Sequence, residues 1–204
     1  MHRKPLLEIL ERYEAVHPEE SVCVGQVRRL VESQPDCFER SCLPGHVTAS
    51  AWILSPDRTK VLLTRHRKLN RWLQLGGHAD GDNDVLRVAL REAREESGMT
   101  EFGVISGAPS PGPGDAILPL DVDVHRIPAR GDEPEHAHHD IRYLLVAREG
   151  QSLAISDESI DLGWFEPAAV EPLGPDESLR RLGRKARELC RGESRWSDDI
   201  PGCE

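Results

Sequence analysis

The sequence predicts an α/β fold in which a central mixed sheet follows a helical N-terminal extension. Residues 1–44 show helical periodicity, residues 45–165 alternate short apolar runs with turns, and one amphipathic helix at 85–97 interrupts those runs. Several short strands around one central helix suit a mixed sheet. At 204 residues the chain is long enough for one domain with additions. We therefore expect a helical extension at 1–44, one α/β domain at 45–190 and a polar tail at 191–204.

The first expected elements are two amphipathic helices. Apolar residues recur at three- and four-residue intervals from Lys4 to Val16 and again from Ser21 to Ser33. Pro18 and Pro35 follow these segments, and proline interrupts a helix because it has no backbone N–H. The two segments predict a helical addition in front of the sheet.

Apolar runs bounded by turn residues predict the strands. They are HVTASAWIL (46–54), KVLLTRH (60–66), RWLQL (71–75), EFGVIS (101–106), LDVDVHRI (120–127) and DIRYLLVA (140–147). The segment from Ser106 to Ala116 is rich in Pro and Gly and predicts an exposed loop. After Trp164 the chain turns helical again, with an amphipathic pattern from Glu177 to Cys190.

The helix expected from Val85 to Ser97 carries the strongest chemical signal. Its apolar residues form one stripe, and Gly98 ends it. Glu92, Glu95 and Glu96 lie three and four positions apart, which brings three carboxylates to one side of the helix. Clustered carboxylate oxygens suit a hard divalent cation, so the sequence predicts a Mg²⁺ or Mn²⁺ site.

The segment from Gly77 to Met99 resembles the Nudix box. The residues in register with that motif are Gly77, Arg91, Glu92, Ala93, Glu95, Glu96, Gly98 and Met99. One position departs, because Asn83 stands where the motif has its first Glu, and the neighbouring Asp82 and Asp84 are possible substitutes. The resemblance implies a Nudix-type α/β/α sandwich and a pyrophosphohydrolase that acts on nucleoside diphosphate derivatives of the sugar nucleotide or ADP-ribose type.

The same resemblance implies roles for residues in and around the box. Glu92, Glu95 and Glu96 would hold the metal, and Arg91 would fix the loop before the helix. Gly76 and Gly77 would let the backbone approach the substrate closely. Glu92 and Glu95 would act in catalysis together with a carboxylate outside the box, for which the loop SDESID offers Glu158 as an extra ligand or general base.

Basic residues offer contacts for the anionic substrate. Arg65, Arg67 and Lys68 form a local basic patch just before the box. Arg142 is a further candidate, because strand alternation places it on one face with His136, His138 and Asp140.

Histidines carry a second signal. Isopentenyl-diphosphate isomerases share the Nudix fold and look similar at His46, which opens the first strand, and at His78, which follows the glycines. That likeness implies a second metal site, for a transition metal, formed by His46, His78, His138 and Asp140. The isomerase activity itself is not expected, because Gly76 stands where that family needs a catalytic Cys and the double Glu of the box is intact.

Composition excludes several classes of protein. The formal net charge of −10 leaves no basic tract, which argues against binding to nucleic acid or to a membrane surface. The five cysteines are scattered, so neither a disulfide scaffold nor a zinc ribbon is expected. No long apolar stretch occurs, and we expect a soluble, cytoplasmic protein.

Two function classes remain open at this point. The leading one is the hydrolase, with a small-molecule nucleotide as its partner and, by family resemblance, a homodimeric state. The alternative is a catalytically weak ligand-binding or sensing module of the same fold, with the N-terminal helices acting in regulation. Asn83 favours the alternative, and the intact glutamates favour the enzyme.

Overall fold

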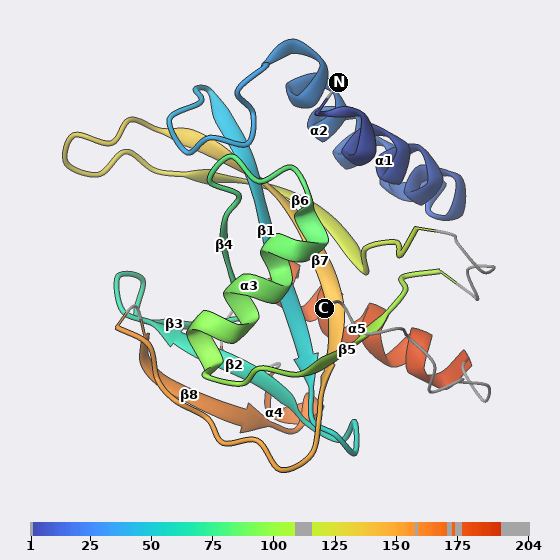
Figure 1. The fold of residues 1–204 in the computed structure, drawn as a ribbon, viewed down its shortest axis with the longest axis vertical. Helices are drawn as coiled ribbons and strands as arrows, with labels where there is room; N and C mark the ends of the chain where they lie inside the picture. Colours follow the sequence, from blue (N-terminus) through green and yellow to red (C-terminus); the bar gives the residue numbers. More distant parts are fainter. Residues whose placement is uncertain (1, 109–115, 158, 171–172, 174–176, 193–204) are drawn as a thin grey trace.

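A mixed sheet forms the centre of the structure, a computed structural model that describes residues 2–108, 116–157, 159–170, 173 and 177–192 (Figure 1). Within these residues the sheet has eight strands. They are β1 (Gly45–Leu54), β2 (Val61–His66), β3 (Arg71–Leu73), β4 (Leu75–His78), β5 (Phe102–Ile105), β6 (Asp121–Ile127), β7 (His136–Ala147) and β8 (Ser159–Phe165).

Strand β1 is the central strand, and all ten of its residues are buried. It runs parallel to β7 on one side and antiparallel to β2 and β4 on the other. Strand β7 continues the sheet through antiparallel pairs with β5 and β6, and β2 through pairs with β3 and β8. The combination of parallel and antiparallel pairs confirms the predicted mixed sheet.

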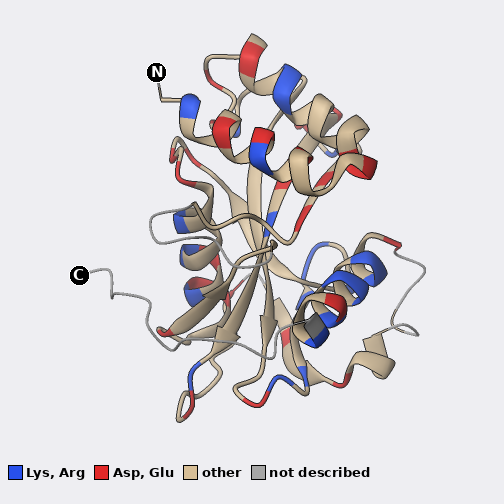
Figure 2. Cartoon of the chain, turned by 90° about the vertical axis from the view of Figure 1, so that its right-hand side faces the viewer, with Lys and Arg blue, Asp and Glu red and all other residues tan. Residues whose placement is uncertain are grey.

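Helices cover the two faces of the sheet. Helix α3 (Val85–Ser97) packs on the face formed by Val47, Ala49, Ala51 and Ile53 of β1. The other face, with Trp52 and Leu54, packs against α4 (Pro167–Val170) and α5 (Glu177–Gly192). Figure 2 shows the sheet edge-on between these layers. The predicted α/β/α sandwich is therefore confirmed, and the alternation along β1 separates its two cores.

The N-terminal helices belong to the same core as α3. Helices α1 (Lys4–Val16) and α2 (Ser21–Ser33), joined by the short helix η1 (Pro18–Glu20), have the predicted bounds. Their buried side chains lie in one hydrophobic cluster with β1 and α3; these are Leu6, Leu10, Tyr13, Val24, Val27, Leu30 and Val31. The ammonium of Lys185 on α5 donates to the Tyr13 hydroxyl at 2.7 Å. The extension is thus an integral part of the fold.

Helix α3 has the local signals that its sequence predicts. The Asp84 side chain accepts a hydrogen bond from the backbone N–H of Arg87 and so caps the first turn. Gly98 ends the helix in the left-handed conformation, with φ 73°. These two caps fix the helix over the residues expected.

Three elements differ from expectation. The run RWLQL divides into β3 and β4, and β7 begins at His136, where it pairs with Ile127 of β6. The segment SDESID was expected to be a loop, but β8 starts within it at Ser159 because that residue pairs with His66 of β2. Long-range pairing decided both boundaries. Most of the loop expected from Ser106 to Ala116, and residues 193–204 of the expected tail, lie outside the described residues.

Two further properties concern the described part of the chain. None of its four cysteines, Cys23, Cys37, Cys42 and Cys190, is in a disulfide. None of the helices found there is long and apolar enough to cross a membrane.

Candidate functional site

Strand β4 meets its neighbours at two glycines. A Cβ atom added to Gly76 would lie 2.3 Å from the Cβ of Ser50 on β1. One added to Gly77 would lie 2.5 Å from Oε2 of Glu92 on α3. Because no side chain intervenes, β4 lies directly against β1 and against the carboxylate of Glu92.

Two of the three box glutamates reach this glycine pair. Glu96 is buried, and its Oε2 accepts a 2.9 Å hydrogen bond from the backbone N–H of Gly76. Glu92 lies one helical turn earlier on the same face, against Gly77. Glu95 is exposed. The structure therefore brings Glu92 and Glu96 together at β4 and leaves Glu95 open to solvent.

The glutamate donor set fits a hard cation. Carboxylate oxygens are the ligands that Mg²⁺ and Mn²⁺ prefer, and the space beside Gly77 would be filled by any Cβ. The three carboxylates do not form a tight trio, since the groups of three with ligand atoms within 4.8 Å among the described residues lie elsewhere. Like charges repel, and here each of two carboxylates has its own donor, Gly76 for Glu96 and Arg91 for Glu92.

Arg91 ties the helix to the end of β4. Its Nη2 donates to the backbone carbonyl of His78 at 2.6 Å and to Oε1 of Glu92 at 2.8 Å. The guanidinium thus holds both the loop that precedes α3 and the carboxylate next to Gly77. This placement agrees with the role that the family resemblance implies for Arg91.

The position that departs from the box motif contacts the N-terminal extension. The Asn83 side chain donates to the carbonyl of His2 at 2.7 Å. Asp82 pairs with Arg87 at 2.5 Å, and Asp84 caps α3. Within the described residues, neither aspartate is hydrogen-bonded to Arg91 or ion-paired with it in place of the missing Glu.

The basic patch lies at the end of β2 and on the turn that leads to β3. Arg65 donates to the side chain of Asn70, and Lys68 is exposed. Arg67 donates to the carbonyls of Asp157 and Ser159, each at 2.8 Å, and so fastens this turn to the start of β8. Glu158, between those two residues, lies outside the described residues.

Arg142 is not available to a substrate, which corrects the prediction. Its side chain is 3% exposed and binds Asp140 at 2.8 Å, Asp123 at 2.8 Å and Asp121 at 3.3 Å. Strand alternation correctly predicted the face of β7 on which Arg142 lies. However, Asp121 and Asp123 of the neighbouring strand β6 neutralise the guanidinium inside the protein.

Helix α5 completes this buried charge network. Arg181 donates to both Asp121 and Asp123, and Lys185 donates to Asp121. Burial alone would raise the pKa of Asp121, but the hydrogen bond from Arg181 and the charges of Arg142 and Lys185 hold that pKa below its ordinary value. This network could not be predicted from the sequence, because α5 lies far from β6 and β7 along the chain.

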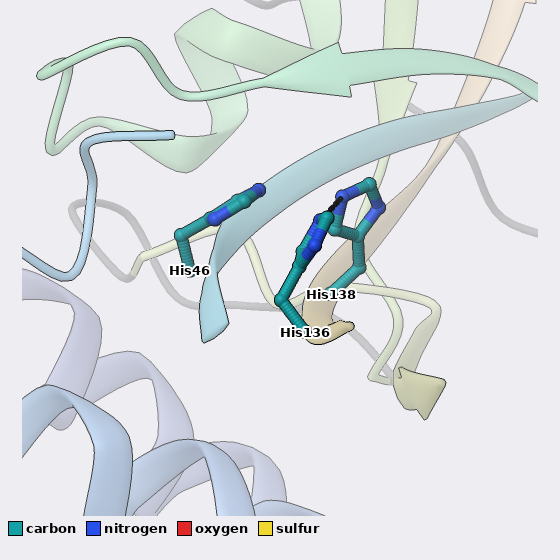
Figure 3. A group of neighbouring side chains, drawn as sticks. All are labelled: His46, His136 and His138. Carbon is teal, nitrogen blue, oxygen red and sulfur yellow. Dashed lines mark hydrogen bonds between the residues drawn. The ribbon is translucent and has the colours of Figure 1, made fainter. Parts of the chain in front are cut away.

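Five histidines converge where β1 and β7 begin. The rings of His46, His78, His136 and His138 lie with centroids 4.9–5.2 Å apart in the contacting pairs, and His125 lies 5.5 Å from His138. One ring nitrogen from each of His46, His136 and His138 lies within 4.8 Å of the others. Figure 3 shows these three side chains pointing toward one another.

Asp140 does not join the histidines, which corrects the predicted ligand set. Its carboxylate accepts hydrogen bonds from Thr48 at 3.1 Å, Ser50 at 2.8 Å and Arg142 at 2.8 Å. It is therefore committed to the buried arginine. His136 takes its place in the compact trio, while His78 stays in ring contact with His46 and His138. The alternation His136-x-His138 was the signal that pointed to His136.

An apolar pocket lies on the face of the sheet that α4 and α5 cover, opposite to α3 and its glutamates. Its walls come from α5, α4 and the hairpin between β1 and β2, with Trp52, Leu54 and Leu179 among the lining residues. Four arginines also line it: Arg58, Arg180, Arg184 and Arg187. None of the predicted site residues lines this pocket.

Solved structures of other proteins share the fold. An Ap4A hydrolase from C. elegans, in a binary complex, superposes with TM-score 0.56 and 18% identity, over 72% of this chain and 98% of that chain. A NUDIX family hydrolase from Clostridium perfringens gives TM-score 0.54 and 24% identity over the same shares. A dihydroneopterin triphosphate pyrophosphohydrolase from E. coli gives 0.52 and 15%, over 68% and 92%. At these identities the likeness is one of fold.

Sequence comparison identifies the family. No curated protein matches the chain. A family model described as NUDIX domain matches residues 44–185, which is more than half of the 204 residues. The match includes the whole segment from Gly77 to Met99, and it confirms the resemblance and the predicted enzyme class, a Nudix pyrophosphohydrolase. The chain therefore belongs to the NUDIX family of hydrolases.

Proposed function

We propose that the protein hydrolyses the diphosphate linkage of a nucleoside diphosphate derivative, of the sugar nucleotide or ADP-ribose type, with Mg²⁺ or Mn²⁺. One observation carries the proposal. Glu96 accepts a hydrogen bond from Gly76 and Glu92 lies against Gly77, so two carboxylates adjoin backbone that no side chain covers. A diphosphate and a hard cation need both features together.

Each residue of the glutamate site has a task in this proposal. Glu92, Glu95 and Glu96 would hold the cation, which when bound neutralises phosphate charge and lowers the pKa of water. Glu96 also fixes the Gly76 backbone through its hydrogen bond. Arg91 keeps Glu92 and the His78 carbonyl in place. Glu95, exposed on α3, is the carboxylate that accepts the proton of the attacking water, with Glu158 as the other candidate for that role or as an extra ligand.

The anionic substrate would be bound by basic side chains near the β2–β3 turn. Arg65, Arg67 and Lys68 are the proposed contacts, and Arg67 is already oriented by its bonds to Asp157 and Ser159. Two of the similar structures are named for enzymes that act on Ap4A and on dihydroneopterin triphosphate. Both compounds therefore belong in the panel of substrates tested.

A ligand-sensing module is the second candidate function. The observation that favours it is the hydrogen bond from the Asn83 side chain to the His2 carbonyl. This bond couples the N-terminal extension to the position at which the chain differs from the box motif. A sensor would bind its nucleotide without turnover. Cytoplasmic location and a homodimeric state are proposed with either function, from composition and from family resemblance.

Turnover of a substrate panel tests the proposal. The panel contains nucleoside diphosphate sugars, ADP-ribose, dinucleotides that include Ap4A, dihydroneopterin triphosphate and nucleoside triphosphates. Each is tested with Mg²⁺ and with Mn²⁺, and the release of phosphate and nucleoside monophosphate is measured. Glu95→Gln is expected to lower kcat by about 100-fold or more, because it removes a charged oxygen that Gln cannot supply. Glu11→Gln, an exposed position on α1, is the matched control. A rate in Glu95→Gln equal to that of the wild type contradicts the assignment, and binding without turnover across the panel favours the sensor.

A further inference from the structure

The histidine trio at the start of β1 and β7 has the features of a metal site distinct from the glutamates. We propose that His46, His136 and His138 bind one divalent transition metal ion of the zinc class. This proposal goes beyond the hydrolase function and does not depend on it. It rests on strand register, on an orphaned ring nitrogen, on the bonds that orient the rings and on one distance.

Strand pairing places the histidines together. In the parallel pair of β1 and β7, His46 lies directly opposite His138. His136 is two residues before His138 and therefore projects from the same face of β7. The arrangement is set by the sheet, so it does not require a flexible loop to close around an ion.

His46 has a buried ring nitrogen that lacks a partner. Its side chain is 1% exposed, and no hydrogen bond reaches its Nε2 from the described residues. A buried polar atom without a hydrogen-bond partner carries a free-energy cost. A metal ion bound to Nε2 removes that cost, since the nitrogen lone pair becomes a ligand.

The other ring nitrogens are oriented in the way that metal-binding histidines usually are. Nδ1 of His136 lies 2.9 Å from the carbonyl of Pro134, and Nδ1 of His46 lies 3.4 Å from the carbonyl of Cys42. A carbonyl accepts only, so Nδ1 carries the proton in each ring and Nε2 presents its lone pair.

The spacing between two ligand atoms fits tetrahedral zinc. Nε2 of His136 lies 3.3 Å from Nε2 of His138. Two nitrogens at about 2.0–2.1 Å from a tetrahedral Zn²⁺ are themselves about 3.3–3.4 Å apart. Uncharged imidazoles favour Zn²⁺, Cu²⁺, Ni²⁺ or Fe²⁺ over Mg²⁺. The exposed carboxylate of Glu133 lies 3.7 Å from Nε2 of His136, and the His78 ring contacts His46 and His138, so both groups are candidates for a fourth ligand.

The histidine site and the glutamate site share strand β4. His78 follows Gly77 directly, and successive side chains of a strand point to opposite faces. The Gly77 position faces Glu92, while the His78 ring contacts His46 and His138. A metal at the histidines would therefore stiffen the strand whose backbone the glutamates contact.

Metal binding by the full-length protein tests this proposal directly. Chelator-treated protein is titrated with Zn²⁺ alone and with Co²⁺ alone, and bound metal is measured after equilibrium dialysis. We expect one Zn²⁺ per chain and the visible absorption of tetrahedral Co²⁺. His136→Gln and His138→Gln are expected to weaken Zn²⁺ binding by more than about 100-fold, because loss of an orienting partner alone costs 10–100-fold. Circular dichroism confirms that each variant is folded.

Two controls separate this site from the glutamates. His66→Gln removes a histidine from β2, outside the trio, and Glu95→Gln removes the proposed catalytic carboxylate; both are expected to bind Zn²⁺ as the wild type does. Absence of Zn²⁺ binding in the wild type, an octahedral Co²⁺ spectrum, or equal binding in the His138→Gln variant would overturn the proposal. If His136→Gln does not fold, Zn²⁺ binding by the His138→Gln variant and the Co²⁺ spectrum of the wild type decide the question. His138 is only half-buried, so its replacement disturbs the core less.

Discussion

Replacing the two glycines of β4 one at a time distinguishes a loss of stability from a loss of catalytic activity. In Gly77→Ala the new methyl group would lie 2.5 Å from Oε2 of Glu92 and 2.6 Å from its Cδ. These are atoms at the end of a side chain, so they can move away. The movement breaks the 2.8 Å bond between Glu92 and Arg91, which costs about 1–2 kcal/mol of stability. It also removes a proposed metal ligand, and we expect kcat to fall by about 100-fold or more.

Gly76→Ala meets a different obstacle. Its methyl group would lie 2.3 Å from Cβ and 2.6 Å from Cα of Ser50, and 2.8 Å from the carbonyl oxygen of Ala49. These atoms belong to the fully buried strand β1 and cannot rotate aside. Overpacking of this kind costs about 1–3 kcal/mol and more where backbone must shift, so we expect a loss at the upper end, about 3 kcal/mol.

Urea unfolding followed by the fluorescence of the four tryptophans measures both losses. With a slope of about 2 kcal/mol/M, the midpoint should fall by roughly 0.5–1 M in Gly77→Ala and by about 1.5 M in Gly76→Ala. Gly25→Ala is the control, because its nearest neighbour is Arg29 at 3.8 Å and alanine favours a helix by about 0.5–1 kcal/mol. Equal midpoints for the two β4 variants, or wild-type turnover in Gly77→Ala, would refute this account of the site.

Two further predictions concern the buried charges. Arg142→Met leaves Asp121, Asp123 and Asp140 without their shared cation and should destabilise the protein by about 3–5 kcal/mol in urea unfolding; a loss below about 1 kcal/mol would show that the network contributes little. The depressed pKa of Asp121 gives a pH dependence of known sign, since its stabilisation is present above the ordinary pKa of 3.8 and is lost as the pH falls below it. The urea midpoint of the wild type should therefore drop between about pH 5 and pH 3, and Asp121→Asn should flatten that drop.

Local signals explain why the helices were predictable. The bounds of α1, α2 and α3 agree with the sequence patterns because each segment has its own apolar periodicity, prolines follow α1 and α2, and Asp84 and Gly98 cap α3. Strand β8 was missed because its pairing partner, β2, lies about ninety residues earlier and the polar residues Ser159 and Asp161 stand on either side of Ile160 at its start. Register with a distant strand, and not local preference, starts it at Ser159.

The same distinction applies to the candidate sites. The glutamate helix and the glycine pair lie within one continuous motif, so their meeting at β4 could be expected from spacing. The role of Arg142 could not be, because the aspartates of β6 that neutralise it become visible only when β6 and β7 are paired. Likewise alternation placed Asp140 on the same face as His138, but the hydrogen bonds that its carboxylate accepts from Thr48, Ser50 and Arg142 depend on three-dimensional contacts.

The pairing of β1 with β7 has a consequence for the synthesis of the chain on the ribosome. Thr48 and Asp140 lie opposite each other although 92 residues separate them. Until β7 has left the exit tunnel, one edge of the apolar strand β1 has no neighbour, and open edges of this kind recruit strands from other chains. Pairings so distant along the chain also form slowly. The interval between the emergence of Leu54 and that of Ala147 is thus the stage at which the nascent protein is most prone to aggregate.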